Sequence, residues 1–287
     1  MNQTQQAAAT RTRTPTRALH LWHLLSLDAP TVATLWTWFA ARTVPLHLLT
    51  AGLAAMFLAV WMLYAADRLL DARQLFADPL HTTNLEARHL FHHRHATAFL
   101  AGILIASLAV AALLPNLPLE ALRLYAILGS LVFGWFLLVH ARATTTHHRL
   151  PKELAVGIAF PAAVFIPTVA RHPDLRLTLL PHALLFAAVC TLNCLSIYAW
   201  EHPASSDAHW TTRYATRHLT TLAATTTLAG LVLTIITRQP LAAAATLSAA
   251  TLLALHRTHR HLSPLTARAA ADLALLTPLL FIAGGLK

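Results

Sequence analysis

The chain of 287 residues is 56% hydrophobic and only 11% charged, and its net charge at neutral pH is +10. A soluble domain has about 25% charged residues, so this composition excludes an ordinary soluble protein, and the high apolar content excludes disorder. The basic residues cluster between apolar runs, which favours anionic lipid headgroups over nucleic acid as their partners. We therefore expect an integral membrane protein that binds no nucleic acid.

Apolar runs of membrane-spanning length recur along the whole sequence. Residues 1–20 are expected to form a basic disordered tail, and residues 21–287 one all-α transmembrane domain with nine helices around a central cavity. The predicted spans are 28–42, 46–66, 97–114, 120–140, 153–170, 179–199, 217–237, 240–256 and 268–286. Pro278 falls inside the last of these spans and implies a kink, because its missing N–H leaves a carbonyl without its helical partner.

The distribution of Lys and Arg predicts the orientation of the chain. If the N-terminus is cytoplasmic, the segments on that side hold 15 of the 21 Lys and Arg residues, and the opposite side holds 6. The positive-inside rule favours this topology. We therefore expect a protein of the bacterial inner membrane whose cavity opens to the cytoplasm and whose C-terminus lies on the opposite side.

The segment Tyr64-Ala-Ala-Asp67-Arg68-Leu-Leu-Asp71 is the most informative local pattern. Asp67 and Asp71 are four residues apart at the end of the second span, so both carboxylates project from one helix face. Two adjacent carboxylates repel each other unless a cation lies between them. Mg²⁺, bound by one or two carboxylates and a substrate phosphate, fits such a pair. The alternative is an interfacial network of ion pairs with Arg68 and Arg73.

This segment resembles the later half of the motif N-D-x-x-D-x-x-x-D of the UbiA superfamily of intramembrane prenyltransferases. That family has nine spans with a cytoplasmic N-terminus, as predicted here. It also carries a lysine before a span that contains glycine, which is similar to Lys152 and Gly157. Its second acidic motif follows an Ile-Tyr-Ala sequence, which residues 197–199 repeat at the end of the sixth span.

The chain departs from both family motifs at identifiable positions. The first two residues of the first motif, Asn and Asp, correspond to Leu63 and Tyr64. After residues 197–199, the family's D-x-x-x-D is replaced by Trp-Glu-His-Pro, in which Glu201 is the acid near the first motif position. The resemblance is therefore to a divergent branch, in which one Mg²⁺ ion is easier to hold than two.

The resemblance implies Mg²⁺-dependent transfer of a polyprenyl group from its diphosphate to a lipophilic acceptor that enters from the membrane lipids. The implied metal ligands are Asp67, Asp71 and Glu201, and these residues together with Lys152 are the implied catalytic residues. The implied substrate-binding residues are Arg68, Tyr64, Asn193, Tyr198, Arg88 and Arg94. For Lys152 the alternative is a cation that sets topology, and for Tyr198 it is the aromatic belt of the membrane interface.

Histidine gives a second hypothesis. Residues 89–95 read His-Leu-Phe-His-His-Arg-His, which contains the H-x-x-H-H pattern of membrane di-iron desaturases and hydroxylases. Further histidines lie at 147–148 and within 256–261, but the H-x-x-x-H box of those enzymes is not found in a suitable place. The alternatives are therefore a His-box metalloenzyme, or a non-catalytic membrane protein with a degenerate prenyl diphosphate site.

Two other acids stand out because they lie in apolar surroundings. Asp272 falls inside the last span, where a buried acid is usually paired or functional, and Arg268 one turn earlier is an expected partner. Asp28 precedes Pro30 and is expected to cap the first helix.

Overall fold

The computed structural model describes residues 13–77, 87–143, 152–202 and 209–283, and within these ranges the chain is helical with no strand. The prediction of an all-α protein is therefore confirmed for the described residues. Helix α2 (Arg13–Leu24) begins inside the segment expected to be a disordered tail. Residues 1–12 of that tail lie outside the described residues.

Each predicted span overlaps a helix of the described residues, although the bounds differ. These helices are α3 (Asp28–Arg42), α4 (Thr50–Ala77), α6 (Ala96–Leu113), α7 (Leu119–Ala143), α8 (Lys152–Arg171), α9 (Arg176–Glu201), α11 (Leu219–Thr237), α12 (Pro240–Thr258) and the pair α13 (Pro264–Leu273) and α14 (Pro278–Ala283). Two shorter helices, α5 (Ala87–Arg94) and α10 (Trp210–Arg217), lie in predicted loops. The largest difference in length is at α4, which continues to Ala77 although the predicted span ends at 66.

Six helical segments of the described chain are long and apolar enough to cross a membrane, namely Thr50–Arg73, Ala96–Asn116, Glu153–Arg171, Pro173–Glu201, Leu219–Thr237 and Pro264–Ile282. Helix α6 shows why these segments suit lipid, because Leu104, Ile105 and Leu108 are each more than 60% exposed. Such a row of large apolar side chains would be unfavourable in water. The six segments are compatible with an integral membrane protein.

The helices form two compact units. Unit 1 consists of Met1–Thr31 and Ala54–Pro115 and contains α2, most of α4, α5 and α6. Unit 2 consists of Val32–Leu53 and Asn116–Lys287 and contains most of α3 together with α7 to α14. The expectation of a single domain over 21–287 stays a prediction.

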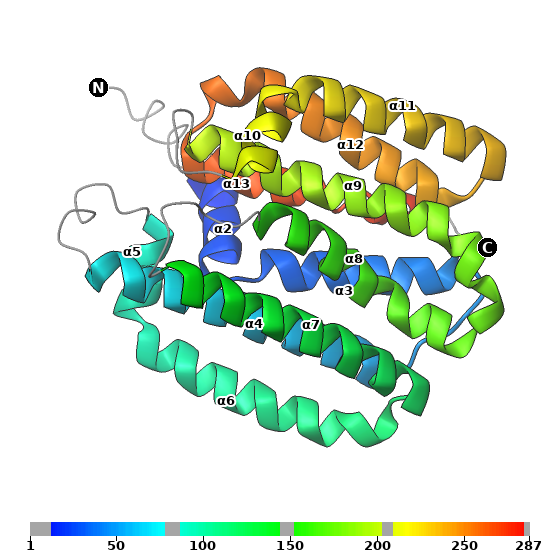
Figure 1. Cartoon of the computed structure of the whole chain (residues 1–287), viewed down its shortest axis with the longest axis horizontal. Coiled ribbons are helices and arrows are strands. Elements are labelled where there is room, and N and C mark those ends of the chain that lie inside the picture. The colour runs from blue at the N-terminus through cyan, green and yellow to red at the C-terminus, as the bar shows by residue number, and fades with distance from the viewer. Residues whose placement is uncertain (1–12, 78–86, 144–151, 203–208, 284–287) are drawn as a thin grey trace, which may run out of the picture. The chain divides into compact units, whose positions relative to one another are not determined.

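Helix α9 is the central helix of unit 2 and packs against α8, α11, α12 and α13 (Figure 1). Its close approach to α8 depends on Gly157, because a Cβ atom at that position would lie 1.9 Å from Oγ1 of Thr191 and 3.0 Å from its Cα. Farther along α9, Phe186 stacks on the indole of Trp36 with ring centroids 4.0 Å apart. Both rings are fully buried, so the core of unit 2 is built around α9.

The last predicted span is broken between α13 and α14, where Pro278 begins the second helix. Two other helices of unit 2, α3 and α12, form hydrogen bonds with the residues of the break. Trp36 Nε1 donates to the Leu275 carbonyl at 2.7 Å, and Thr277 Oγ1 donates to the Ala244 carbonyl at 2.8 Å. The kink expected from Pro278 is thus a full interruption whose polar groups find partners inside the unit.

Candidate functional site

The residues of the aspartate-rich segment lie in the last turns of the apolar part of α4, in unit 1. Asp67 and Asp71 are both half-buried and lie one turn apart on the same side of the helix. The candidate membrane span on this helix runs to Arg73 and therefore includes both carboxylates. The predicted placement of two acids on one face at the end of an apolar helix is confirmed.

Arg68 lies between these acids in the sequence, and its guanidinium is bound inside unit 1. Only 3% of the residue is exposed. Its Nη1 donates to the carbonyl of His23 at 2.7 Å, and its Nη2 donates to Asp28 Oδ2 at 3.2 Å and to the Tyr64 hydroxyl at 2.6 Å. The guanidinium also stacks over the Tyr64 ring at 4.2 Å. Arg68 and Tyr64, expected to bind substrate, therefore form part of a buried polar cluster.

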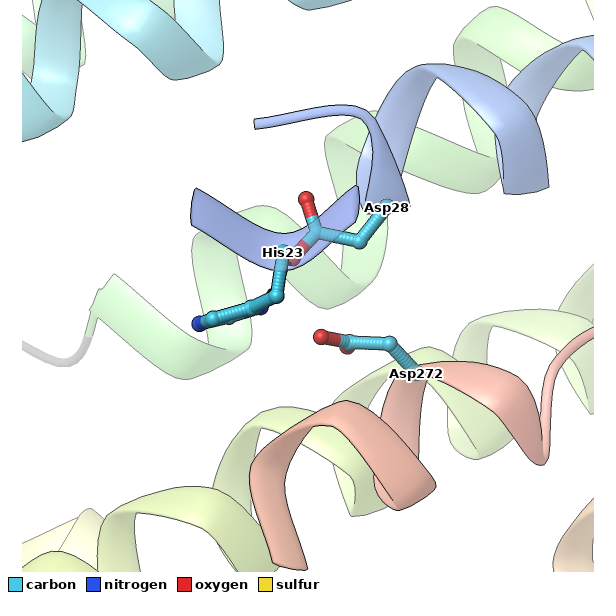
Figure 2. Close-up of side chains that lie close together, drawn as sticks. All are labelled: His23, Asp28 and Asp272. Carbon is cyan, nitrogen blue, oxygen red and sulfur yellow. Dashed lines mark hydrogen bonds and ion pairs between the residues drawn. The ribbon is translucent and has the colours of Figure 1, made fainter. Parts of the chain in front are cut away.

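The cluster is completed by His23 and Asp28, whose side chains face each other at the turn between α2 and α3 (Figure 2). His23 Nδ1 lies 2.5 Å from Asp28 Oδ2, and the two side chains are 0% and 1% exposed. Asp28 also accepts the backbone N–H of Ala29 at 3.0 Å. The sequence interpretation of Asp28 as a helix cap missed its pairing with Arg68. The signal for it was an arginine in an apolar helix, because such a charge needs a buried counter-ion.

An apolar groove of about 380 Å³ runs along α4 and α6 in unit 1. It is lined by Leu25, Leu27, Phe57, Leu58, Trp61, Phe99, Gly102, Ile105, Ala106 and Ala109. The Nε1 of Trp61 donates to the Leu25 carbonyl at 3.1 Å, and its ring stacks on Phe99. Gly102 leaves room for that ring, since a Cβ atom would lie 2.8 Å from Trp61 Cη2.

The groove and the aspartate-rich segment share helix α4. Trp61 precedes Asp67 by six residues, which corresponds to about 9 Å along a helix axis. The residues of α4 that line the apolar groove are therefore followed on the same helix by two carboxylates. The sequence gives no sign of this groove, because the facing residues come from α6 and from the α2–α3 turn.

In unit 2, Glu201 and Tyr198 lie at the end of α9. Both carboxylate oxygens of Glu201 accept hydrogen bonds from Arg268 Nη1, at 2.6 and 2.9 Å. The two side chains are only 12% and 14% exposed, so this is a largely buried ion pair. Tyr198 stacks on the ring of His202 with centroids 4.8 Å apart.

Asn193 lies two turns earlier on α9 and is 6% exposed. Its Nδ2 donates to Asp272 Oδ1 at 3.1 Å, and Asp272 lies on α13 of the same unit. Arg268, the partner expected for Asp272, binds Glu201. Asp272 thus forms a hydrogen bond with Asn193 of another helix, and the expected pairing with Arg268 stays a prediction.

The remaining predicted site residues are cations. Arg94 is exposed at the end of α5. Arg88 lies in α5 and Lys152 at the start of α8, but their side chains are outside the described part of the structure. Tyr64, Asp67, Arg68 and Asp71 therefore lie on α4 in unit 1. Asn193, Tyr198 and Glu201 lie on α9 in unit 2, where each contacts a different partner.

The three described histidine side chains of the predicted box have different partners. His92 is buried and lies 3.0 Å from the Ser26 hydroxyl, His93 stacks on Phe76, and His95 bonds to a backbone carbonyl one turn back. Within the described residues, no three histidines of the predicted clusters gather as a metal site would require. His147 and His148 lie outside the described residues.

Comparison of the chain with protein-family models, with curated proteins and with solved structures gives no match. The resemblance to the UbiA superfamily therefore rests on the sequence motifs alone.

Proposed function

We propose that the protein is a UbiA-like intramembrane prenyltransferase. It would transfer a polyprenyl group from its diphosphate to a lipophilic acceptor, in a nine-span domain of the bacterial inner membrane whose cavity opens to the cytoplasm. The observation that carries the proposal is the order of features on α4, where the apolar groove at Trp61 is followed by Asp67 and Asp71.

A prenyl diphosphate has an apolar chain and a strongly anionic head, so its site needs an apolar groove that ends in a polar region. The groove in unit 1, at about 380 Å³, lies within the roughly 300–1,000 Å³ typical of ligand pockets. Its walls are apolar, and Ile105, which lines it, is 67% exposed, so a chain can enter sideways from lipid. The indole of Trp61 offers a π-face that favours an allylic cation.

The carboxylates of Asp67 and Asp71 fit the preference of Mg²⁺ for hard oxygen ligands, and they would hold the ion. When bound, Mg²⁺ supplies positive charge that neutralises the diphosphate as it leaves. Glu201 is left out of this ligand set, because both of its oxygens accept from Arg268.

The other residues of unit 1 have supporting roles. Arg68 and Tyr64 bind each other and the α2–α3 turn, so they position the face of α4 that carries the acids. The exposed guanidinium of Arg94 on α5 is a cation for the phosphate oxygens, because arginine donates charge-assisted hydrogen bonds to phosphate. Because Arg68 is buried, no exposed cation lies between Asp67 and Asp71 on α4.

The test is prenyl diphosphate binding to the detergent-purified chain with and without Mg²⁺. We expect Mg²⁺-dependent binding that Asp67→Asn and Asp71→Asn each weaken by about tenfold or more, as the loss of a metal-held charge implies. Asp174→Asn is the matched control, since Asp174 is an exposed acid of the segment Pro173–Leu175 in unit 2. Binding that is absent in both conditions, or equal in all three variants, would contradict the proposal and favour a non-catalytic protein.

A further inference from the structure

A second cavity, in unit 2, has a chemical character opposite to that of the α4 site. It has a volume of about 190 Å³ and lies where α9 ends and α13 begins. These are the ends of the candidate spans Pro173–Glu201 and Pro264–Ile282, so the cavity lies at the level where an apolar span gives way to polar surroundings. We call it the α9–α13 pocket.

The pocket is lined by both apolar and basic groups. Its base is the Arg268–Glu201 ion pair, and Leu262 lies at its rim. Arg260 also lines the pocket and is exposed, and among the described residues no carboxylate is paired with it. With Glu201 already bound by one arginine, the second arginine leaves the pocket with a net positive charge.

One wall of the pocket is rigid. Trp200 stacks on the imidazole of His259 with centroids 5.1 Å apart, and Trp200 Nε1 donates to Nδ1 of His256 at 3.1 Å. His259 Nδ1 lies 2.6 Å from the carbonyl of His256, so that nitrogen is the donor. The indole and both imidazoles are thus held in place by hydrogen bonds before any ligand binds, which lowers the entropic cost of binding.

We propose that the α9–α13 pocket binds the phosphate group of a ligand whose net charge is negative. Arg260 is the principal hydrogen-bond donor to that phosphate. An interfacial pocket that combines arginine, a tryptophan wall and apolar rim residues matches the headgroup of an anionic lipid. The volume of about 190 Å³ is below the range of pockets that enclose a drug-sized molecule, and it suits a headgroup whose acyl chains stay in the membrane. This proposal does not depend on the prenyltransferase assignment.

The test measures lipid binding to the full chain in detergent by native mass spectrometry. The probes are phosphatidylglycerol, which is anionic, and phosphatidylcholine, which is zwitterionic. The variant is Arg260→Gln and the matched control is Arg257→Gln. Arg257 is an exposed arginine of α12 only three residues away, and it does not line the pocket. Both variants make the same change in net charge, and both side chains are exposed, so folding should survive.

We expect phosphatidylglycerol to bind in preference to phosphatidylcholine. The Arg260→Gln variant should weaken that binding by about tenfold, since a charge-assisted hydrogen bond is lost, and Arg257→Gln should leave it within about twofold. Inorganic phosphate added as a competitor separates the two sources of the ligand. Failure to displace the lipid supports a lipid headgroup, and displacement supports a free phosphate as the ligand of the same pocket.

Two results would overturn the proposal. Equal weakening by the two arginine variants would mean that the positive surface attracts lipid without a defined site. Equal binding of the two lipids to the unmodified chain would mean that the pocket does not select negative charge.

Discussion

The end of α4 in unit 1 and the end of α9 in unit 2 use the same residue types in opposite ways. On α4 the arginine is buried and bound to Asp28, whereas the two acids are half-buried. At the end of α9 the acid Glu201 is bound by Arg268, whereas Arg260 is exposed at a pocket. At both ends a buried ion pair stabilises the fold, formed by Arg68 and Asp28 in unit 1 and by Arg268 and Glu201 in unit 2. Under the two proposals above, the end of α4 would bind a cation and the end of α9 an anion.

The largest expected effect comes from removing the buried partner of Asp28. Arg68→Met should lower the free energy of unfolding by about 3–5 kcal/mol, because it leaves a buried carboxylate without its guanidinium. Thermal unfolding in detergent measures this loss, and Arg73→Gln, at an exposed arginine of the same helix, is the control. If Arg68→Met unfolds at the same temperature as the unmodified protein, the buried pair of Arg68 and Asp28 does not stabilise unit 1.

The second-largest expected effect on stability concerns the packing of α9 against α8. Gly157→Ala should destabilise the protein by about 1–3 kcal/mol, because the added methyl group would overlap Thr191, including its backbone. The matched control is Gly129→Ala on α7, where nothing lies within 4 Å of the new Cβ atom, so that helix propensity alone should stabilise by up to about 1 kcal/mol. Opposite shifts in the unfolding midpoint are expected, and shifts of the same sign and size would contradict the close approach.

A third prediction tests the paired acid of unit 2. Glu201→Gln should cost about 1–2 kcal/mol of stability, since the charge-assisted bonds to Arg268 weaken. It should also raise phosphatidylglycerol binding several-fold, because the negative charge that lines the α9–α13 pocket is removed. Native mass spectrometry reads the second effect separately from the first. Weaker lipid binding in a folded variant would show that Glu201 itself helps to hold the ligand.

The smallest expected effect is at the groove of unit 1. Gly102→Ala should change stability by less than about 1 kcal/mol, because the clash is with the far end of the Trp61 side chain, which can shift. The shifted indole should narrow the groove and weaken prenyl diphosphate binding, while binding of inorganic diphosphate stays unchanged. Equal loss of binding for both ligands would mean that the substitution acts on the diphosphate site. It would contradict the proposal that the groove binds the prenyl chain.

The local sequence pattern predicted the positions of the helices well. It predicted poorly which side chains bind each other between different helices. Apolar runs and prolines located the helical segments, and the spacing of Asp67 and Asp71 predicted their common face. The length of α4 was underestimated because its polar last turns, up to Ala77, carry no membrane signal. Arg68 binds a carboxylate 40 positions away, and Arg268 binds one 67 positions away. Such pairs depend on how helices meet in space, which helix periodicity does not encode.

The interruption between α13 and α14 has a consequence for how the chain enters the membrane. Its buried carbonyl and hydroxyl groups form hydrogen bonds with Trp36 of α3 and with backbone and hydroxyl groups of α12. An unsatisfied backbone group in hydrocarbon costs several kcal/mol, so the last span alone is a poor substrate for insertion. In a membrane, we therefore expect the C-terminal segment to settle only after α3 and α12 have folded and can supply these partners.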